Sequence, residues 1–229
     1  MTLKGEFLWG SNYTFLIEAT SQGISLAGVY KPVRGERPLW DFPSASLAHR
    51  EVAAFIVSQA AGWNFVPATV YRRKAPLGPG SVQLYVDHDS DYHYFNFTQE
   101  DVQRLRPVVL FDLLINNADR KGSHVMIGPD QRIWLIDHGV CFHAEDKLRT
   151  VIWDFVGQPI PDELCAHLAA LLEKMQPIKP EPSPLAKALL EHLSQAELRA
   201  MIRRGEKLLA AGQFPSPDPA RRPYPWPQI

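Results

Sequence analysis

Two aspartates bracket a segment that has the pattern of a β-hairpin. Asp119 lies in the polar loop 116–124, and Asp137 follows the apolar run 134–136, with turn residues at 128–130 between them. A hairpin returns its two ends to the same edge of a sheet, so both carboxylates can face one cleft. Mg²⁺ prefers a few hard oxygen ligands and keeps substrate phosphates in its shell. One carboxylate can therefore hold such an ion while the other orients a hydroxyl group.

A lysine and a glutamate upstream suggest a phosphate site. Lys31 ends the apolar run 28–31, and Glu51 lies in a segment with helical periodicity. If the two side chains pair, the glutamate sets the rotamer of the lysine, and the lysine can meet the α- and β-phosphate oxygens of a triphosphate. Ser11 and Asn12, in a turn ahead of the first predicted strand, offer backbone N–H groups to the terminal phosphates.

The elements that must position these residues begin with a β-rich region, residues 1–86. Alternating β-branched, aromatic and small polar residues predict a hairpin with strands at 12–19 and 23–31. The same criteria predict strands at 66–71 and 81–86, separated by a turn rich in proline and glycine.

A single helix is predicted within this β-rich region. Apolar residues keep a 3.6-residue period from Leu47 to Ala60 and stop at Gly62. Ser44 or Ser46 is expected to cap its first turn, because serine oxygens accept hydrogen bonds from the free N–H groups there.

The rest of the chain is predicted to be mostly helical. A helix is expected over 102–116, and Ser194 with Glu197 forms a capping box for a helix that ends at Gly212. The proline-rich tail favours an extended strap or disorder. We therefore expect one domain in four parts: an N-lobe at 1–86, a hinge at 87–95, a C-lobe at 96–213 and the tail at 214–229.

The order of these residues resembles the kinase-like superfamily. The shared features are a strand lysine, a helical glutamate, Asp119-Arg120 in a loop, and Asp137 two positions before Gly139. The closest likeness is to the phosphatidylinositol 3- and 4-kinase-like branch, whose motifs read D-R-H-x-x-N and D-F-G, and within it to a compact bacterial group typified by actinobacterial proteins. The resemblance spans roughly residues 7–145. It implies an α+β, two-lobed protein-kinase-like fold with an antiparallel β N-lobe carrying one helix and a mostly helical C-lobe.

The resemblance also implies an ATP-dependent phosphotransferase that uses Mg²⁺ or Mn²⁺. Lys31 would contact the ATP phosphates with Glu51 as its partner. Asp119 would be the catalytic-loop acid and Asp137 a metal ligand. An adenine site would lie at the strand residues 83–86, with Gln83, Tyr85 and Val86 as candidate contacts and Met126 and Ile136 as candidates for its lower wall.

Three positions depart from the motifs of the family. Lys121 replaces the histidine of the loop, His124 replaces its metal-binding asparagine, and His138 replaces the phenylalanine of D-F-G. Imidazole is a poorer Mg²⁺ ligand than an amide oxygen but suits Mn²⁺ or Zn²⁺, so His124 is a second candidate metal ligand. Two alternative functions fit these departures: a nucleotide-binding pseudokinase with a scaffold or regulatory role, and an AMP transferase on the same fold.

Composition excludes other classes of protein. Lys and Arg number 24 and Asp and Glu 25, so no global positive field attracts nucleic acid. The longest apolar run, 107–116, is broken by Asp112 and is shorter than the roughly 18 residues of a membrane span. Only two cysteines and no secretion signal are present, which predicts a cytoplasmic protein. The expected partners are ATP and a hydroxyl-bearing acceptor, which is a protein, a lipid or a small molecule.

Overall fold

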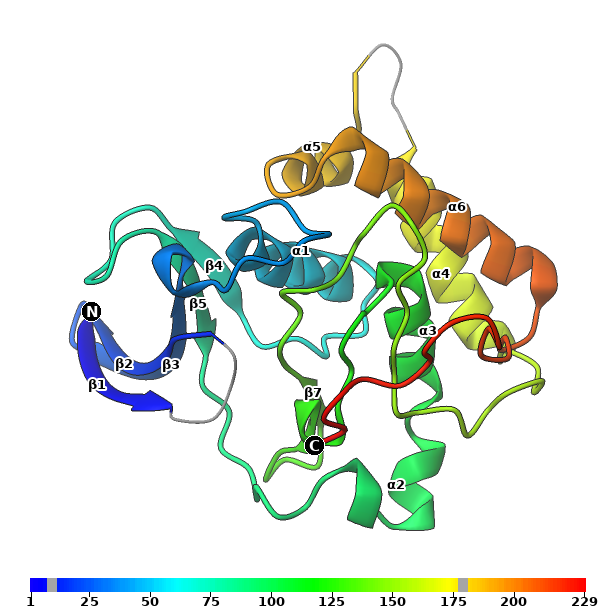
Figure 1. The fold of residues 1–229 in the computed structure, drawn as a ribbon, viewed down its shortest axis with the longest axis horizontal. Coiled ribbons are helices and arrows are strands. Elements are labelled where there is room, and N and C mark those ends of the chain that lie inside the picture. The colour runs from blue at the N-terminus through cyan, green and yellow to red at the C-terminus, as the bar shows by residue number, and fades with distance from the viewer. Residues whose placement is uncertain (8–11, 177–180) are drawn as a thin grey trace.

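The protein has a sheet lobe and a helical lobe, with one helix between them. A computed structural model describes residues 1–7, 12–176 and 181–229. Figure 1 shows the N-terminal sheet on the left, α1 (Leu47–Ala60) in the middle with α5 (Pro184–Leu190) above it, and α3 (Arg106–Ile115), α4 (Asp162–Met175) and α6 (Gln195–Ala211) on the right. No helix in the described ranges is long and apolar enough to cross a membrane.

The N-terminal sheet is antiparallel and has the strand order β1-β2-β3-β5-β4. Its strands are β1 (Thr2–Phe7), β2 (Thr14–Ser21), β3 (Ile24–Pro32), β4 (Thr69–Arg72) and β5 (Gly80–Leu84). The sequence pattern does not predict β1, because this edge strand is almost wholly exposed and lacks apolar alternation. The strand predicted at 66–71 begins only at Thr69, after Pro67, which has no N–H for a ladder hydrogen bond. The strand predicted at 81–86 ends at Leu84.

Helix α1 (Leu47–Ala60) has the predicted range, but the predicted serine cap is wrong. Ser46 precedes the helix and makes no side-chain capping bond. Instead, the Glu36 carboxylate accepts hydrogen bonds from the backbone N–H groups of Ala48 at 3.0 Å and Leu47 at 3.3 Å. A carboxylate suits this place because a helix N-terminus carries free N–H groups and a partial positive charge. The loop after β3 is thereby tied to the start of α1.

The helical lobe contains two helices where the sequence predicts one over 102–116. These are α2 (Gln99–Gln103) and α3 (Arg106–Ile115), and Pro107 lies in the first turn of α3, where its missing N–H costs nothing. The predicted hairpin is present as β6 (Val125–Ile127) and β7 (Ile133–Leu135). The remaining helices are α4 (Asp162–Met175), α5 (Pro184–Leu190) and α6 (Gln195–Ala211), and short 3₁₀ helices are η1 (Val33–Gly35), η2 (Tyr94–Asn96) and η3 (Gly122–His124).

Two predicted end signals of α6 are confirmed. The Ser194 and Glu197 side chains form the reciprocal capping box at its start. Gly212 ends the helix in the left-handed conformation, with φ of 62°. The core of this lobe forms around α3, where Leu110, Phe111 and Leu114 are fully buried.

The C-terminal segment is an extended strap rather than a disordered tail. Phe214 is buried, and its N–H donates to the carbonyl oxygen of Gln158 at 3.0 Å. Further along, the Thr150 N–H donates to the carbonyl oxygen of Pro223 at 3.0 Å, and the Gly122 N–H donates to that of Gln228 at 2.8 Å. The strap therefore runs from the end of α6 to the loop that contains Asp119.

Gly80 lies in β5 opposite the end of β3, where the sheet has no room for a larger side chain. A Cβ atom there would lie 2.3 Å from the carbonyl oxygen of Lys31 and 2.8 Å from the Cα atom of Pro32. Because both are backbone atoms, β3 and β5 must separate, and we expect Gly80→Ala to lower the free energy of unfolding by about 1–3 kcal/mol in urea denaturation. Gly5→Ala, in β1 with no atom within 4 Å of its Cβ, is the matched control. Equal free energies of unfolding for Gly80→Ala and Gly5→Ala would contradict the expected separation of β3 and β5.

Candidate functional site

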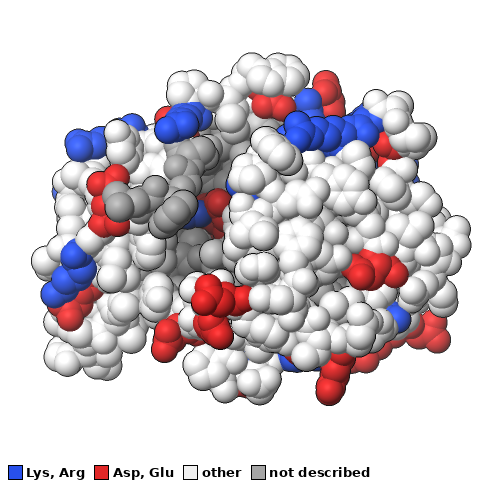
Figure 2. Space-filling model, turned by 60° about the horizontal axis from the view of Figure 1, so that its bottom comes forward, with Lys and Arg blue, Asp and Glu red and all other residues white. Residues whose placement is uncertain are grey.

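Three charged side chains from distant parts of the chain meet between the lobes. Lys31 Nζ lies 2.5 Å from Glu51 Oε1 and 3.0 Å from Asp137 Oδ1. Strand β3 carries the lysine, α1 the glutamate, and the residues after β7 the aspartate. Figure 2 shows the hollow between the two lobes, where acidic and basic surfaces are visible side by side. The ion pair expected from the sequence between Lys31 and Glu51 is thus present, and Asp137 joins it.

Lys31 and Asp137 stabilise each other's charged forms. Burial favours the neutral form of Lys31, but the charges of Asp137 and Glu51 outweigh it and raise the pKa of the lysine above its ordinary value. In return, the Lys31 charge holds the pKa of Asp137 well below its usual range. The cluster places two carboxyl groups around one amine, an arrangement that leaves carboxylate oxygen available to a divalent cation.

Glu51 connects the lysine to the backbone that follows Asp137. Its side chain is only 4% exposed, and Oε2 accepts a hydrogen bond from the His138 N–H at 3.0 Å. Asp137 itself has φ of 62°, a left-handed conformation that aspartate and asparagine tolerate better than most residues. Glu51 thus fixes both the amine and the strained turn that carries the Asp137 carboxylate.

His124 lies between the two aspartates. Its Nε2 is 3.3 Å from Asp137 Oδ2, and its Nδ1 is 3.0 Å from the backbone oxygen of Asp119. Burial lowers the pKa of His124 to about 4, so the ring is neutral at physiological pH. A neutral imidazole with one nitrogen facing a carboxylate is a suitable partial site for a transition-metal ion.

Asp119 is partly exposed at the edge of the same site. Its Oδ2 lies 3.7 Å from Lys121 Nζ, and its backbone N–H donates to Asn117 Oδ1 at 3.0 Å. Burial raises the pKa of Asp119 to about 6, although the positive charge of Lys121 acts in the opposite direction. This carboxyl group can therefore gain or lose a proton at a pH only slightly below neutral.

The described side chains do not form a complete metal site by themselves. Within residues 1–7, 12–176 and 181–229, no three His, Cys, Asp or Glu side chains converge on one point. Asp137 and His124 could hold an ion together if phosphate oxygens and water completed its coordination, as is common for ions that act on nucleotides.

A buried ion pair that sequence reasoning missed supports the loop. Arg120 is completely buried, and its Nε and Nη2 donate to the two carboxylate oxygens of Asp112 at 2.8 and 2.9 Å. Its Nη1 donates to the carbonyl oxygens of His124 and Ile136, both at 3.1 Å. The pair joins α3, the Asp119 loop and the end of β7. The sequence feature that could have indicated this pair is Asp112, the acidic residue that interrupts the apolar run of α3.

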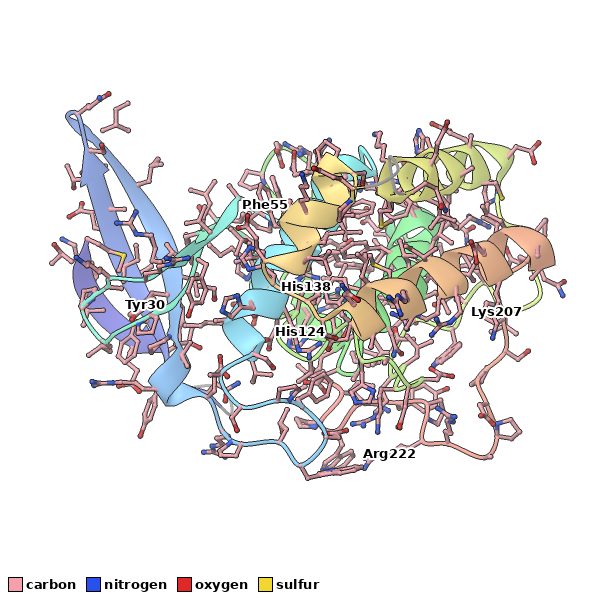
Figure 3. The ribbon with its side chains drawn as sticks, turned by 90° about the horizontal axis from the view of Figure 1, so that it is seen from above. Tyr30, Phe55, His124, His138, Lys207 and Arg222 are labelled. Atoms are coloured by element: carbon pink, nitrogen blue, oxygen red, sulfur yellow. The ribbon has the colours of Figure 1, made fainter. Side chains whose placement is uncertain are left out.

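His138 belongs to the same group of buried polar side chains as Asp112 and Arg120. Its Nε2 lies 2.9 Å from Arg120 Nη2, and its ring packs edge-on against Phe111 with centroids 5.8 Å apart. Burial and the neighbouring Arg120 charge lower its pKa well below the ordinary value, so the neutral ring accepts this hydrogen bond. Figure 3 shows His138 beside His124 in the middle of the molecule.

The cavity at Lys31 is small in this arrangement. Its volume is about 80 Å³. Its lining includes Asn12, Thr14, Lys31, Glu36, Glu51 and Asp137. Pockets that enclose drug-sized ligands typically measure roughly 300–1,000 Å³, so a nucleotide requires a wider cleft. Asn12 Oδ1 is already bonded to the Arg37 N–H at 2.8 Å, and Ser11 lies outside the described residues.

The five candidate adenine residues are not among the described residues that line this cavity. Gln83 is buried and its amide donates to the Thr69 hydroxyl at 2.9 Å. The Tyr85 N–H donates to the Ala27 carbonyl at 3.1 Å, and the Val86 carbonyl lies 3.0 Å from a ring nitrogen of His88. Met126 is buried in the hairpin, and Ile136 is half-buried beyond β7. An adenine site at these residues therefore stays a prediction.

A comparison with curated proteins finds a relative that matches almost the whole chain. No family model matches the chain. The chain is 40% identical over 262 residues to Protein Rv2133c of Mycobacterium tuberculosis, with 99% of this chain and 91% of that protein covered. It is 26% identical over 145 residues to phosphatidylinositol 4-kinase gamma 4 of Oryza sativa subsp. japonica, where 54% of this chain and 26% of the rice protein are covered.

Solved structures confirm the predicted two-lobed, kinase-like α+β fold. The Helicobacter pylori proinflammatory kinase CtkA gives a TM-score of 0.54 at 10% identity, covering 92% of this chain and 91% of that chain. Hydra Fam20 gives 0.53 at 14% identity, covering 92% and 84%. The Golgi casein kinase gives 0.50 at 16% identity, covering 91% and 72%. At these identities the likeness concerns the fold alone.

Proposed function

Since this chain belongs to the family of the mycobacterial Protein Rv2133c and has a kinase-like fold, we propose that it is an ATP-dependent phosphotransferase of the phosphatidylinositol 3/4-kinase-like type. The observation that carries the proposal is the convergence of Lys31, Glu51 and Asp137 between the lobes. A lysine held by a helical glutamate and placed beside a metal-binding aspartate is the arrangement that positions a triphosphate for transfer. The weak similarity to a rice phosphatidylinositol 4-kinase supports the narrower type.

The roles of the residues follow from their charges and places. Lys31 would bind the α- and β-phosphate oxygens after exchanging its present contact with Asp137. Asp137 and His124 would hold Mg²⁺ or Mn²⁺, which neutralises charge on the transferred phosphoryl group when bound. Asp119 would orient the acceptor hydroxyl and take up its proton. The acceptor itself is a hydroxyl group of a protein, a lipid or a small molecule.

His124 supports a second candidate, a nucleotide-binding pseudokinase. It occupies the place where the family motif has an asparagine, and imidazole binds Mg²⁺ poorly. A protein that binds ATP without transferring phosphate would have the same Lys31–Glu51–Asp137 cluster. AMP transfer on the same fold is a third outcome, and the mass added to a product separates it from phosphoryl transfer.

Calorimetry with Mg-ATP and Mn-ATP tests the nucleotide site directly. We expect binding by the unmodified protein and loss of binding in Lys31→Ala. The matched control is Lys4→Ala, which removes a surface lysine paired with Glu18 in the same sheet. Mass spectrometry of candidate acceptors incubated with ATP then distinguishes addition of phosphate, addition of AMP and no addition. No binding with either metal would refute both the phosphotransferase and the pseudokinase.

The pH dependence of turnover provides a test of Asp119. Because this carboxyl must be ionised to accept a proton, we expect kcat/KM to rise with pH through a value of about 6. Lys121→Gln removes a charge that lowers the pKa of Asp119, so the rise should move to higher pH. Lys74→Gln, in an exposed loop, should leave the profile unchanged. A flat profile between about pH 5 and 8 would contradict the role of Asp119.

A further inference from the structure

A large cavity lies in the helical lobe, away from the Lys31 cluster. Its volume is about 520 Å³, within the range of small-molecule pockets. It is bounded by the end of α3, by α6, by the segment 144–153 and by the C-terminal strap. Figure 3 shows Lys207 on the side of α6 where the strap runs. Much of the wall is apolar and includes Leu113, Leu148, Trp153, Leu208, Pro215 and Pro223.

The cavity is lined by more positively charged than negatively charged side chains. Four cationic and two acidic side chains line it, namely Arg203, Arg204, Lys207, Arg221, Asp146 and Asp218. Both acids are close to Arg221, at 3.6 Å for Asp146 and 3.2 Å for Asp218. Within the described part of the chain, Arg203, Arg204 and Lys207 form no ion pair. One face of α6 therefore presents three cationic side chains to the cavity, none of them in an ion pair with a described carboxylate.

Arg204 is the most deeply placed of the three. Its Nε donates to the carbonyl oxygen of Leu114 at 3.0 Å and its Nη1 to that of His143 at 3.2 Å. Its Nη2 is buried and has no hydrogen-bond partner among the described residues. Burial lowers the pKa of this guanidinium to about 10, and the charge of Asp146 offsets the desolvation only in part.

Trp153 supplies a second buried donor on the cavity wall. Its Nε1 is buried and has no acceptor among the described residues. Buried donors are rarely left without acceptors, because the lost hydrogen bond to water costs about 1–3 kcal/mol. Two such donors and two further cations around one apolar cavity favour a ligand that brings acceptor oxygens and negative charge.

We propose that this cavity binds a small amphipathic anion, with a phosphate or carboxylate head near Arg203, Arg204 and Lys207 and an apolar body against Leu148, Trp153 and Leu208. The head group complements charges that the protein leaves unpaired. The apolar body covers a wall that would otherwise face water. The site is separate from the Lys31 cluster and stands whether or not the protein transfers phosphate.

Calorimetric titration with four probes tests the site: decyl phosphate, decanoate, decanol and inorganic phosphate, each below its aggregation concentration. We expect the two amphipathic anions to bind at least about tenfold more tightly than decanol or inorganic phosphate, because only they match both the charges and the apolar wall. The tighter of the two anions identifies the head group. Binding of neither amphipathic anion, or equal binding of decanol, would overturn the proposal.

Charge-reversal variants test whether the amphipathic anions bind in this cavity. We expect Lys207→Glu and Arg203→Glu, both at exposed positions, to weaken decyl phosphate binding by at least about tenfold. Arg199→Glu is the matched control on the same helix, because Arg199 is exposed and bonds to Gln195 instead of lining the cavity. Far-ultraviolet circular dichroism verifies that each variant is folded. Unchanged affinity in Lys207→Glu and Arg203→Glu would show that any binding occurs elsewhere.

Discussion

Replacing Asp137 with asparagine is expected to reduce metal-dependent nucleotide binding by more than about a hundredfold. Asparagine keeps the size of the side chain and tolerates the left-handed backbone, where φ is 62°. What it removes is the negative charge that faces Lys31 at 3.0 Å and His124 at 3.3 Å. Isothermal calorimetry with Mn-ATP measures the effect.

The control for this variant is Asp130→Asn, in the turn of the hairpin that precedes Asp137. Asp130 is exposed and its Oδ2 lies 4.0 Å from Arg132, so its loss should leave nucleotide binding unchanged. If Asp137→Asn bound Mn-ATP as tightly as the unmodified protein, Asp137 would not be a metal ligand. Lys31 could then still be a phosphate contact, which the Lys31→Ala variant examines separately.

Asp112→Ala is expected to lower the free energy of unfolding by about 3–5 kcal/mol, measured by chemical denaturation. The substitution leaves Arg120 buried with no carboxylate, although it keeps the guanidinium bonds to the backbone of His124 and Ile136. An uncompensated charge in the interior is costly because neither water nor a counter-ion solvates it. Loss of order in the Asp119 loop should follow.

A surface pair and a double variant serve as controls for Asp112→Ala. Glu181→Ala breaks the exposed pair with Lys187 and should cost less than about 1 kcal/mol. Asp112→Leu combined with Arg120→Met removes both charges and should recover much of the lost stability, because the cost comes from leaving one charge unpaired. A loss below 1 kcal/mol in Asp112→Ala would show that Arg120 reaches water or another acid.

The sequence alone predicted the features that depend on neighbouring residues. The hairpin β2–β3, the range of α1 and the capping box of α6 were read correctly because periodicity and end signals lie within a few residues of each other. The order of Lys31, Glu51, Asp119 and Asp137 also indicated the kinase-like fold, which similar structures confirm. The roles of these residues, and of those assigned to adenine, remain proposals.

The tertiary structure decided which distant groups meet. The Glu36 cap of α1 and the Asp112–Arg120 pair join residues whose approach no local pattern encodes. The cavity beside α6 likewise forms only when α3, α6 and the strap pack together, leaving Arg204 without a carboxylate partner among the described residues. Hydrophobic periodicity indicates which face of a helix or strand is buried. Whether a charged side chain is buried, and whether an opposite charge lies beside it, depends on the other elements that pack against that face.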